Sequence, residues 1–159
     1  MSERLQELKK KYKELGEEIE RLENQGKVWA PKVSEKYWCI TPSGYVDFDT
    51  WANNCLDIDR YQMGNCFKTK EEAEKVIEKM EIYTQLKRLA EEINTEPIDW
   101  GDSTQKKHRI FYDWDERELL TDNNNVFQMM GTIYCTSKEF LDIAKERIGE
   151  DRLLKLFKE

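Results

Sequence analysis

Two stretches of this 159-residue chain match each other without a gap. "GNCFKTKEEAEKVIEKM" begins at Gly64, and "GTIYCTSKEFLDIAKERI" begins at Gly131. Each combines a glycine, an aromatic residue three positions later and the Thr-x-x-Glu spacing of a capping box, which closes the first turn of a helix. The pattern predicts a corner where a strand turns into a helix. Its recurrence predicts two similar units, and the alternative is chance similarity between two such corners.

The first predicted unit covers residues 35–96. Aromatic and β-branched residues flank "TPSG", which predicts a hairpin of strands Tyr37–Ile40 and Tyr45–Phe48. The less regular "DTWANNCLDIDRYQM" then leads to the corner. An apolar stripe predicts a long helix from Thr69 until "NTEP" ends it at Pro97.

The second predicted unit covers residues 97–159. "KHRIFYDWDERELLTDNNN" predicts a strand, an acidic turn and a strand, and "VFQMMGTIYC" predicts a further strand. A shorter helix opens at the capping box of Thr136 and Glu139, and "IGEDRLLKLFKE" predicts a last short helix. The fold class expected is therefore α+β, with two antiparallel strand-strand-strand-helix units.

A helical arm over residues 1–26 precedes these units. Its apolar residues alternate at spacings of three and four, the a/d seam of a coiled coil over about three heptads. The predicted oligomerisation residues are Leu5, Leu8, Tyr12, Leu15, Ile19 and Leu22.

Charge order along the arm predicts how it pairs. With Leu5 at an a position, Lys11 and Glu18 occupy g positions, and an antiparallel copy brings them opposite each other. A parallel copy would instead set Glu18 against Glu23. We therefore expect an antiparallel homodimer, and the alternative is that the seam folds back on this chain's own long helix.

Composition narrows the function classes. The net charge is −7, which argues against broad adhesion to nucleic acid or to anionic membrane. No secretory signal or membrane span is recognisable, so we expect a cytosolic protein. The four cysteines form no CxxC pair and are expected to be buried free thiols, with His108 as the one histidine that could complete a thiolate metal site.

The sequence contains no recognisable catalytic motif. GxSxG, HExxH and glycine-rich phosphate loops are absent, so we expect neither an enzyme nor a cofactor. Three Asp-x-Asp pairs, which begin at Asp47, Asp57 and Asp113, could face a hard cation from a strand. Turns and solvated strand edges produce the same pairs, and we expect no metal site.

Tryptophans flanked by polar residues are candidate binding residues. Trp51 in "DTWAN" and Trp114 in "YDWDE" fit either a core or a binding surface. The acidic neighbours of Trp114 could meet a basic groove on a partner. The predicted binding residues are Trp51, Arg60, Asp113, Trp114, Asp115 and Glu116.

The combination of "KYWCITPSGYV", "DIDRYQMGNCFKTKEEAE" and "LKRLAEEIN" resembles a small domain of uncharacterised proteins encoded by phages and prophages of Gram-positive bacteria. The resemblance covers residues 35 to 96 and implies a phage accessory protein in the host bacterial cytoplasm. Small acidic proteins of that setting often block a host defence effector, such as a CRISPR nuclease or its guide complex. We therefore expect a non-catalytic inhibitor that binds a host protein.

Two other functions stay open. A nucleic-acid-binding accessory protein would use the Lys-rich half of the arm and "STQKKHR" on phosphates. A protein that sequesters a nucleotide defence signal would hold it in a pocket at a two-fold interface.

Overall fold

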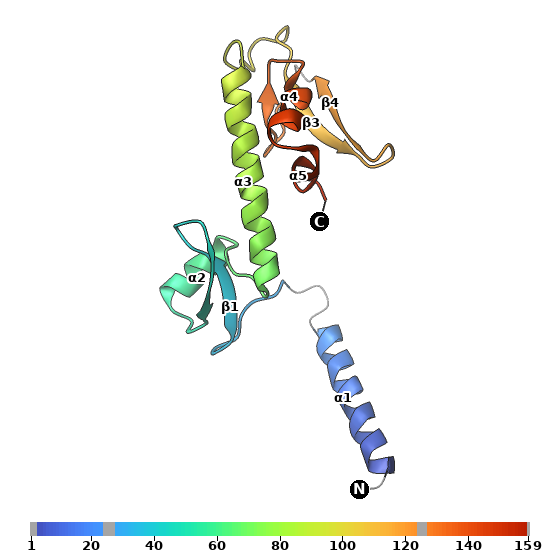
Figure 1. Cartoon of the computed structure of the whole chain (residues 1–159). Coiled ribbons are helices and arrows are strands. Elements are labelled where there is room, and N and C mark those ends of the chain that lie inside the picture. The colour runs from blue at the N-terminus through green and yellow to red at the C-terminus, as the bar shows by residue number, and fades with distance from the viewer. Residues whose placement is uncertain (1–2, 24–27, 124–126, 159) are drawn as a thin grey trace. The chain divides into compact units, whose positions relative to one another are not determined.

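The computed structural model describes residues 3–23, 28–123 and 127–158. Over these residues the chain is mixed α+β, with five helices, a two-stranded sheet and a three-stranded sheet (Figure 1). This confirms the predicted α+β class. No helix in the described part of the chain is long and apolar enough to cross a membrane.

Contacts divide the chain into two units, residues 1–73 and 74–159. The division differs from the predicted boundary between residues 96 and 97. The long helix α3 (Lys70–Ile93) begins in the first unit, but its apolar residues Ile82, Leu86 and Leu89 belong to the core of the second. An amphipathic stripe predicts that a helix is buried, and it does not say which neighbouring segments cover it.

In the first unit, α1 (Glu3–Glu23) precedes an antiparallel hairpin of β1 (Lys36–Ile40) and β2 (Val46–Thr50). The predicted hairpin is confirmed. Its turn closes because Gly44 adopts a left-handed φ of 82° and donates its amide to the carbonyl of Thr41 at 2.9 Å.

Helix α2 (Cys55–Gln62) lies where the sequence predicted only a less regular stretch. Asn54 and Asp57 form a capping box that starts it: the Asn54 side chain accepts from the Asp57 amide at 3.0 Å, and the Asp57 carboxylate accepts from the Asn54 amide at 3.3 Å. The Thr-x-x-Glu pattern does not include this box, because Asn and Asp take the places of Thr and Glu.

The first corner has the predicted geometry. Gly64 has a φ of 72°, and Phe67 pairs with Trp38 of β1 in an antiparallel bridge. The Thr69 hydroxyl accepts from the Glu72 amide at 3.2 Å, while the Glu72 carboxylate accepts from the Thr69 amide at 3.3 Å. The first capping box is therefore confirmed, and α3 starts at the next residue.

In the second unit, β3 (His108–Asp113) is flanked by β4 (Glu118–Asn123) and by β5 (Tyr134–Cys135). The predicted strand, acidic turn and strand are confirmed. The two short helices α4 (Phe140–Arg147) and α5 (Glu150–Leu154) follow, and Phe140 and Leu153 are fully buried in the core with α3.

The second corner differs from the prediction. Gly131 has a φ of 75° and Tyr134 pairs with Arg109, as at the first corner. However, no side chain caps α4, which begins only at Phe140, so the second capping box is wrong. The Thr136 hydroxyl instead lies 3.3 Å from Asn94 Oδ1, and the predicted third strand shrinks to two residues. The duplication of whole units therefore stays a prediction.

Candidate binding surface

The turn between β3 and β4 contains four of the predicted binding residues. One carboxylate oxygen of Asp113 accepts from the amides of Asp115 at 2.9 Å and Glu116 at 3.0 Å. Arg117 adopts a left-handed φ of 59°, and Glu118 pairs with Asp113 across the hairpin. The Asp113 carboxylate and the backbone pairing of Asp113 with Glu118 therefore order residues 113–118, which we call the acidic-aromatic turn.

Trp114 is the exposed aromatic residue of this turn, with 68% of its surface accessible. Its ring meets that of Tyr112 edge-on, with centroids 4.9 Å apart and planes at 83°. Tyr112 is buried in the core of the second unit. The indole therefore packs against a buried ring on one side and leaves most of its surface accessible to a partner.

The turn is strongly acidic. Asp113, Asp115, Glu116 and Glu118 lie within six residues, and Arg117 is the one basic side chain among them. No ion pair to these four carboxylates occurs in the part of the chain that the structure describes. The turn therefore presents a net negative potential around an apolar ring.

Trp51, the other predicted anchor, is only 9% exposed. Its ring packs edge-on against Tyr37 at 5.8 Å and Tyr61 at 6.2 Å between ring centroids. Of the two roles that the sequence left open for Trp51, the structure places it in the core. Trp51 therefore belongs to the core of the first unit, whereas Trp114 belongs to the second unit.

Arg60 takes part in an internal network rather than in an open surface. Its guanidinium donates to the Tyr37 hydroxyl and to the Asp49 carboxylate, both at 2.7 Å. The Tyr37 hydroxyl donates in turn to Asp57 at 2.8 Å. Burial raises the pKa of Tyr37 to about 12, and these hydrogen bonds keep Arg60 charged.

The seam of α1 is exposed along its described length. Leu5, Leu8, Tyr12, Leu15 and Ile19 each have between 43% and 81% of their surface accessible. Leu22 lies outside the side chains that the structure describes. An apolar stripe of this exposure is typical of a helix that pairs with another helix.

The Asp-x-Asp pairs serve local hydrogen bonds. The Trp38 amide bonds to Phe67, so the facing Phe48 amide points to the open edge of β2, where the Asp47 carboxylate accepts it at 2.8 Å. Asp49 accepts from the Thr50 amide in the same way. These contacts occupy outward-facing amides of β2 and so disfavour the pairing of another strand with this edge. No group of three or more metal-ligating side chains occurs among the described residues.

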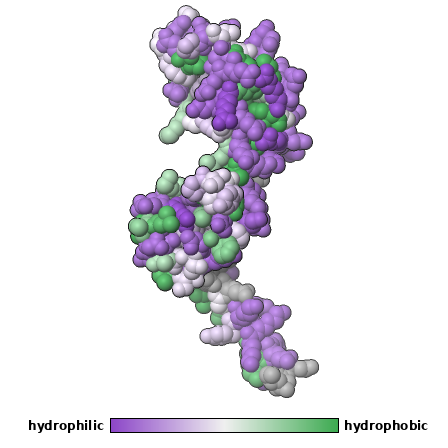
Figure 2. Space-filling view, turned by 60° about the vertical axis from the view of Figure 1, so that its left-hand side comes forward, coloured by the Kyte–Doolittle hydropathy of each residue, from purple (hydrophilic) through white to green (hydrophobic). Residues whose placement is uncertain are grey.

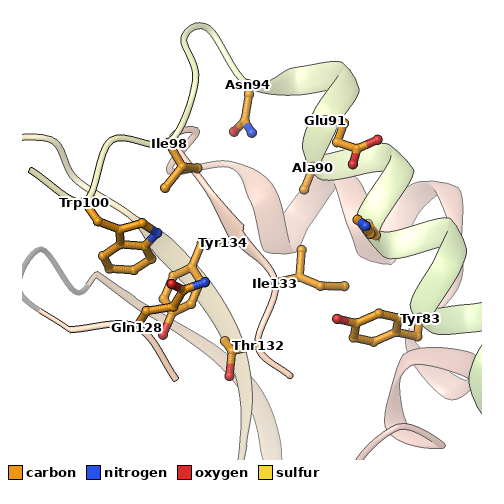
Figure 3. A pocket seen from close by; sticks show the side chains of 11 residues that line it. Tyr83, Ala90, Glu91, Asn94, Ile98, Trp100, Gln128, Thr132, Ile133 and Tyr134 are labelled. Atoms are coloured by element: carbon orange, nitrogen blue, oxygen red, sulfur yellow. The ribbon is translucent and has the colours of Figure 1, made fainter. Parts of the chain in front are cut away.

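A cavity of about 240 Å³ in the second unit was not predicted from the sequence (Figure 3). Trp100 and Tyr134 line one end and Tyr83 the other, with Ile133 between them. A second hollow of about 180 Å³ shares Tyr83 and Ile133. The lining residues come from three separate segments, so no local motif could have indicated it.

The surface is mostly hydrophilic with separate hydrophobic patches on the face that Figure 2 shows. No protein-family model, curated protein or solved structure matches the sequence. The resemblance to phage-encoded proteins therefore stays a prediction.

Proposed function

We propose that this chain is a non-catalytic binding protein whose acidic-aromatic turn captures a basic surface of a partner protein. The observation that carries the proposal is the exposed ring of Trp114, which packs against the buried Tyr112 ring. The carboxylates around it form no ion pairs within the described part of the chain. Tryptophan is a favoured anchor of protein interfaces, and a preordered turn loses little entropy on binding. The surrounding charge favours encounter with Lys- and Arg-rich surfaces.

The partner we favour is a host antiviral effector, such as a CRISPR nuclease or its guide complex. The resemblance to phage and prophage proteins supports a role in the bacterial cytoplasm, where such effectors act. A nuclease must hold a polyanion, so its working groove is basic. An acidic turn with one aromatic anchor could block that groove without any chemistry of its own.

The test starts with affinity capture from a nuclease-treated lysate of a Gram-positive bacterium, followed by binding assays with the purified captured protein. Trp114→Ala should weaken that binding by about 30-fold, which corresponds to loss of an anchor worth about 2 kcal/mol. Tyr45→Ala is a matched control, because Tyr45 is also an exposed aromatic residue near a hairpin turn. Equal affinities of both variants and the wild type would contradict the proposed surface.

The nucleic-acid-binding alternative is less well supported by the second unit. In "STQKKHR", the ammonium of Lys107 is fully buried and donates to the carbonyls of Asp102 and Gln105 at 2.9 and 3.0 Å. Arg109 forms a bidentate pair with Asp122 at 2.8 Å. Two of the cationic side chains in this stretch therefore bind groups of the same chain and are not available to contact phosphates. Binding of labelled single-stranded DNA that falls steeply with salt would favour this alternative.

The nucleotide-sequestering alternative has the larger cavity as its candidate site. Lys87 and Glu91 both line this cavity, so the positive charge of one is balanced by the negative charge of the other. Phosphate groups favour sites where cations converge. A cyclic dinucleotide that raises the melting temperature in proportion to its concentration would favour this alternative.

We also propose that α1 pairs with α1 of a second copy in the antiparallel direction. The exposed seam provides the apolar contact, and the charge order sets the direction. In an antiparallel pair, Lys11 of each copy faces Glu18 of the other. The salt bridge of Lys11 to Glu7 at 3.0 Å within the helix is exposed and therefore contributes little that would oppose this contact.

Charge exchange tests the direction of pairing. Lys11→Glu alone or Glu18→Lys alone should weaken self-association about tenfold, because each places like charges opposite each other twice. An equimolar mixture of the two variants should form a heterodimer, measured by sedimentation equilibrium. Lys10→Glu, on the outer helix face, is the control. Failure of the mixture to recover association would contradict antiparallel pairing.

A further inference from the structure

The hydrogen bonds of the first corner place two cysteines opposite each other. Trp38 and Phe67 exchange both backbone hydrogen bonds, at 2.9 and 2.8 Å. In an antiparallel pair, the residue after Trp38 faces the residue before Phe67. Cys39 therefore faces Cys66. The next step is also paired, because the Asn65 side chain bonds to both the amide and the carbonyl of Ile40, at 2.7 and 2.8 Å. The register at Cys39 is therefore fixed from both sides.

This register suits a covalent cross-link. Since Trp38 and Phe67 form the hydrogen-bonded pair, Cys39 and Cys66 occupy the adjacent non-hydrogen-bonded position, where Cα atoms lie about 4.5 Å apart in antiparallel strands. Disulfides span Cα separations of about 4.4–6.8 Å. Side chains of facing residues point to the same side, and Cys66 indeed packs against the buried cluster that contains Cys39 and Trp51.

We propose that Cys39 and Cys66 are a thiol modification site that a disulfide oxidant of the glutathione class converts to an internal disulfide. Cys66 is half-buried and Cys39 is only 2% exposed, so Cys66 reacts first. Its thiolate attacks one sulfur of oxidised glutathione and expels a glutathione thiolate. The Cys39 thiolate then attacks the Cys66 sulfur and expels the second glutathione. The two cysteines lose two electrons and two protons, and the oxidant becomes two reduced glutathione molecules.

Burial makes this reaction slow at neutral pH. It raises the pKa of Cys66 to about 11 and also raises that of Cys39. The charged or titratable groups that face the two thiols are each other, Arg60, Asp57, Asp49 and Asp47. Arg60 opposes the rise at both thiols, whereas the carboxylates add to it. The thiolate fraction, and with it the rate of oxidation, therefore increases as pH rises from 7 to 9.

The disulfide would stabilise the corner. The segment from Gly64 to Phe67 is held to β1 by one backbone bridge and by the Asn65 side chain. A bond between Cys39 and Cys66 closes a loop that contains β2 and α2, and such closure lowers the entropy of the unfolded chain. The oxidised protein should therefore melt at a higher temperature than the reduced protein.

Oxidised glutathione is the probe for the test. The full-length protein is incubated with it at pH 8.5, remaining thiols are alkylated, and linked peptides are mapped by mass spectrometry. The wild type should yield a peptide pair joined through Cys39 and Cys66. Cys39→Ala should instead retain one glutathione on Cys66, because the resolving thiol is missing. Exposed Cys55 serves as an internal control for the activity of the oxidant.

Two results would overturn the proposal. One is a wild-type protein in which Cys55 carries glutathione while Cys39 and Cys66 both remain alkylatable. The other is a linkage through Cys55 or Cys135 in place of the predicted pair. Because both readouts use the wild-type protein, they hold even if Cys39→Ala fails to fold.

Discussion

Replacement of Asp57 by alanine should destabilise the first unit more than any change to its exposed carboxylates. Asp57 is 1% exposed, and its carboxylate accepts hydrogen bonds from the Tyr37 hydroxyl at 2.8 Å, the Ala52 amide at 2.8 Å and the Asn54 amide at 3.3 Å. Burial alone would raise the pKa of Asp57, but these hydrogen bonds outweigh burial and hold the pKa below its ordinary value. The side chain is therefore charged, buried and fully partnered.

The expected loss follows from these contacts. A hydrogen bond to a charged acceptor contributes about 1.5–3 kcal/mol, and Asp57 has two short ones and a longer one that also caps α2. After truncation the Tyr37 hydroxyl retains only its contact with Arg60. We expect Asp57→Ala to lower the free energy of unfolding of the first unit by about 3–5 kcal/mol, as for a broken buried pair.

Hydrogen exchange measured by mass spectrometry can locate this loss. Amides of β1, β2 and α2 should lose protection in Asp57→Ala, while those of β3 and α4 should not change. Asp59→Ala is the matched control, because Asp59 is the exposed partner in the same Asp-x-Asp pair. A loss below about 1 kcal/mol, or an equal loss in Asp59→Ala, would refute the reasoning.

Three further predictions concern single side chains. Lys107→Met should cost about 2 kcal/mol in urea unfolding of the second unit, because two loop carbonyls lose their donor and Trp100 loses the ammonium 5.2 Å from its ring. Thr69→Ala should cost about 1 kcal/mol by removing a cap of α3, whereas Thr136→Ala should leave exchange in α4 unchanged and loosen the end of α3 near Asn94. Burial, aided by Lys106, lowers the pKa of His108 in the folded state, so the unfolded chain binds the proton more readily. Stability should therefore fall as pH drops from 7 to 5.5, through the ordinary histidine pKa of about 6.5, and His108→Phe should remove this slope in thermal unfolding.

The elements that could be predicted from the sequence are those with a local signal. The two hairpins follow from alternating apolar residues around polar turns, and α3 follows from its stripe and its capping box. Helix α2 was missed because its capping box uses Asn54 and Asp57, and because the two side chains sit among residues that also suit a turn. The predicted strand before Cys135 has only two residues that pair with β3, Tyr134 and Cys135.

The candidate surface was partly predictable for the same reason. Trp114 and its acidic neighbours form one continuous turn, so the sequence places them together. The fate of Trp51 depended on Tyr37 and Tyr61, which reach it through tertiary packing. The proposed pairing of Cys39 with Cys66 could not be predicted from the sequence, because it depends on the register of a bridge between Trp38 and Phe67, which twenty-eight residues separate.

The two corners show which part of a repeated pattern is physically required. Both keep a glycine with positive φ followed three residues later by an aromatic residue in a bridge, at Phe67 and at Tyr134. Without a Cβ at the first position the chain can reverse direction at low cost, and the aromatic residue then anchors the new segment to a strand.

The threonine two residues after the aromatic residue makes different contacts at the two corners. At the first corner it caps a helix, whereas at the second its hydroxyl contacts Asn94, and α4 begins later without a side-chain cap. A capping box is worth only about 1 kcal/mol, so a tertiary hydrogen bond of similar strength can replace it, whereas a side chain at either glycine would add the strain of a positive φ.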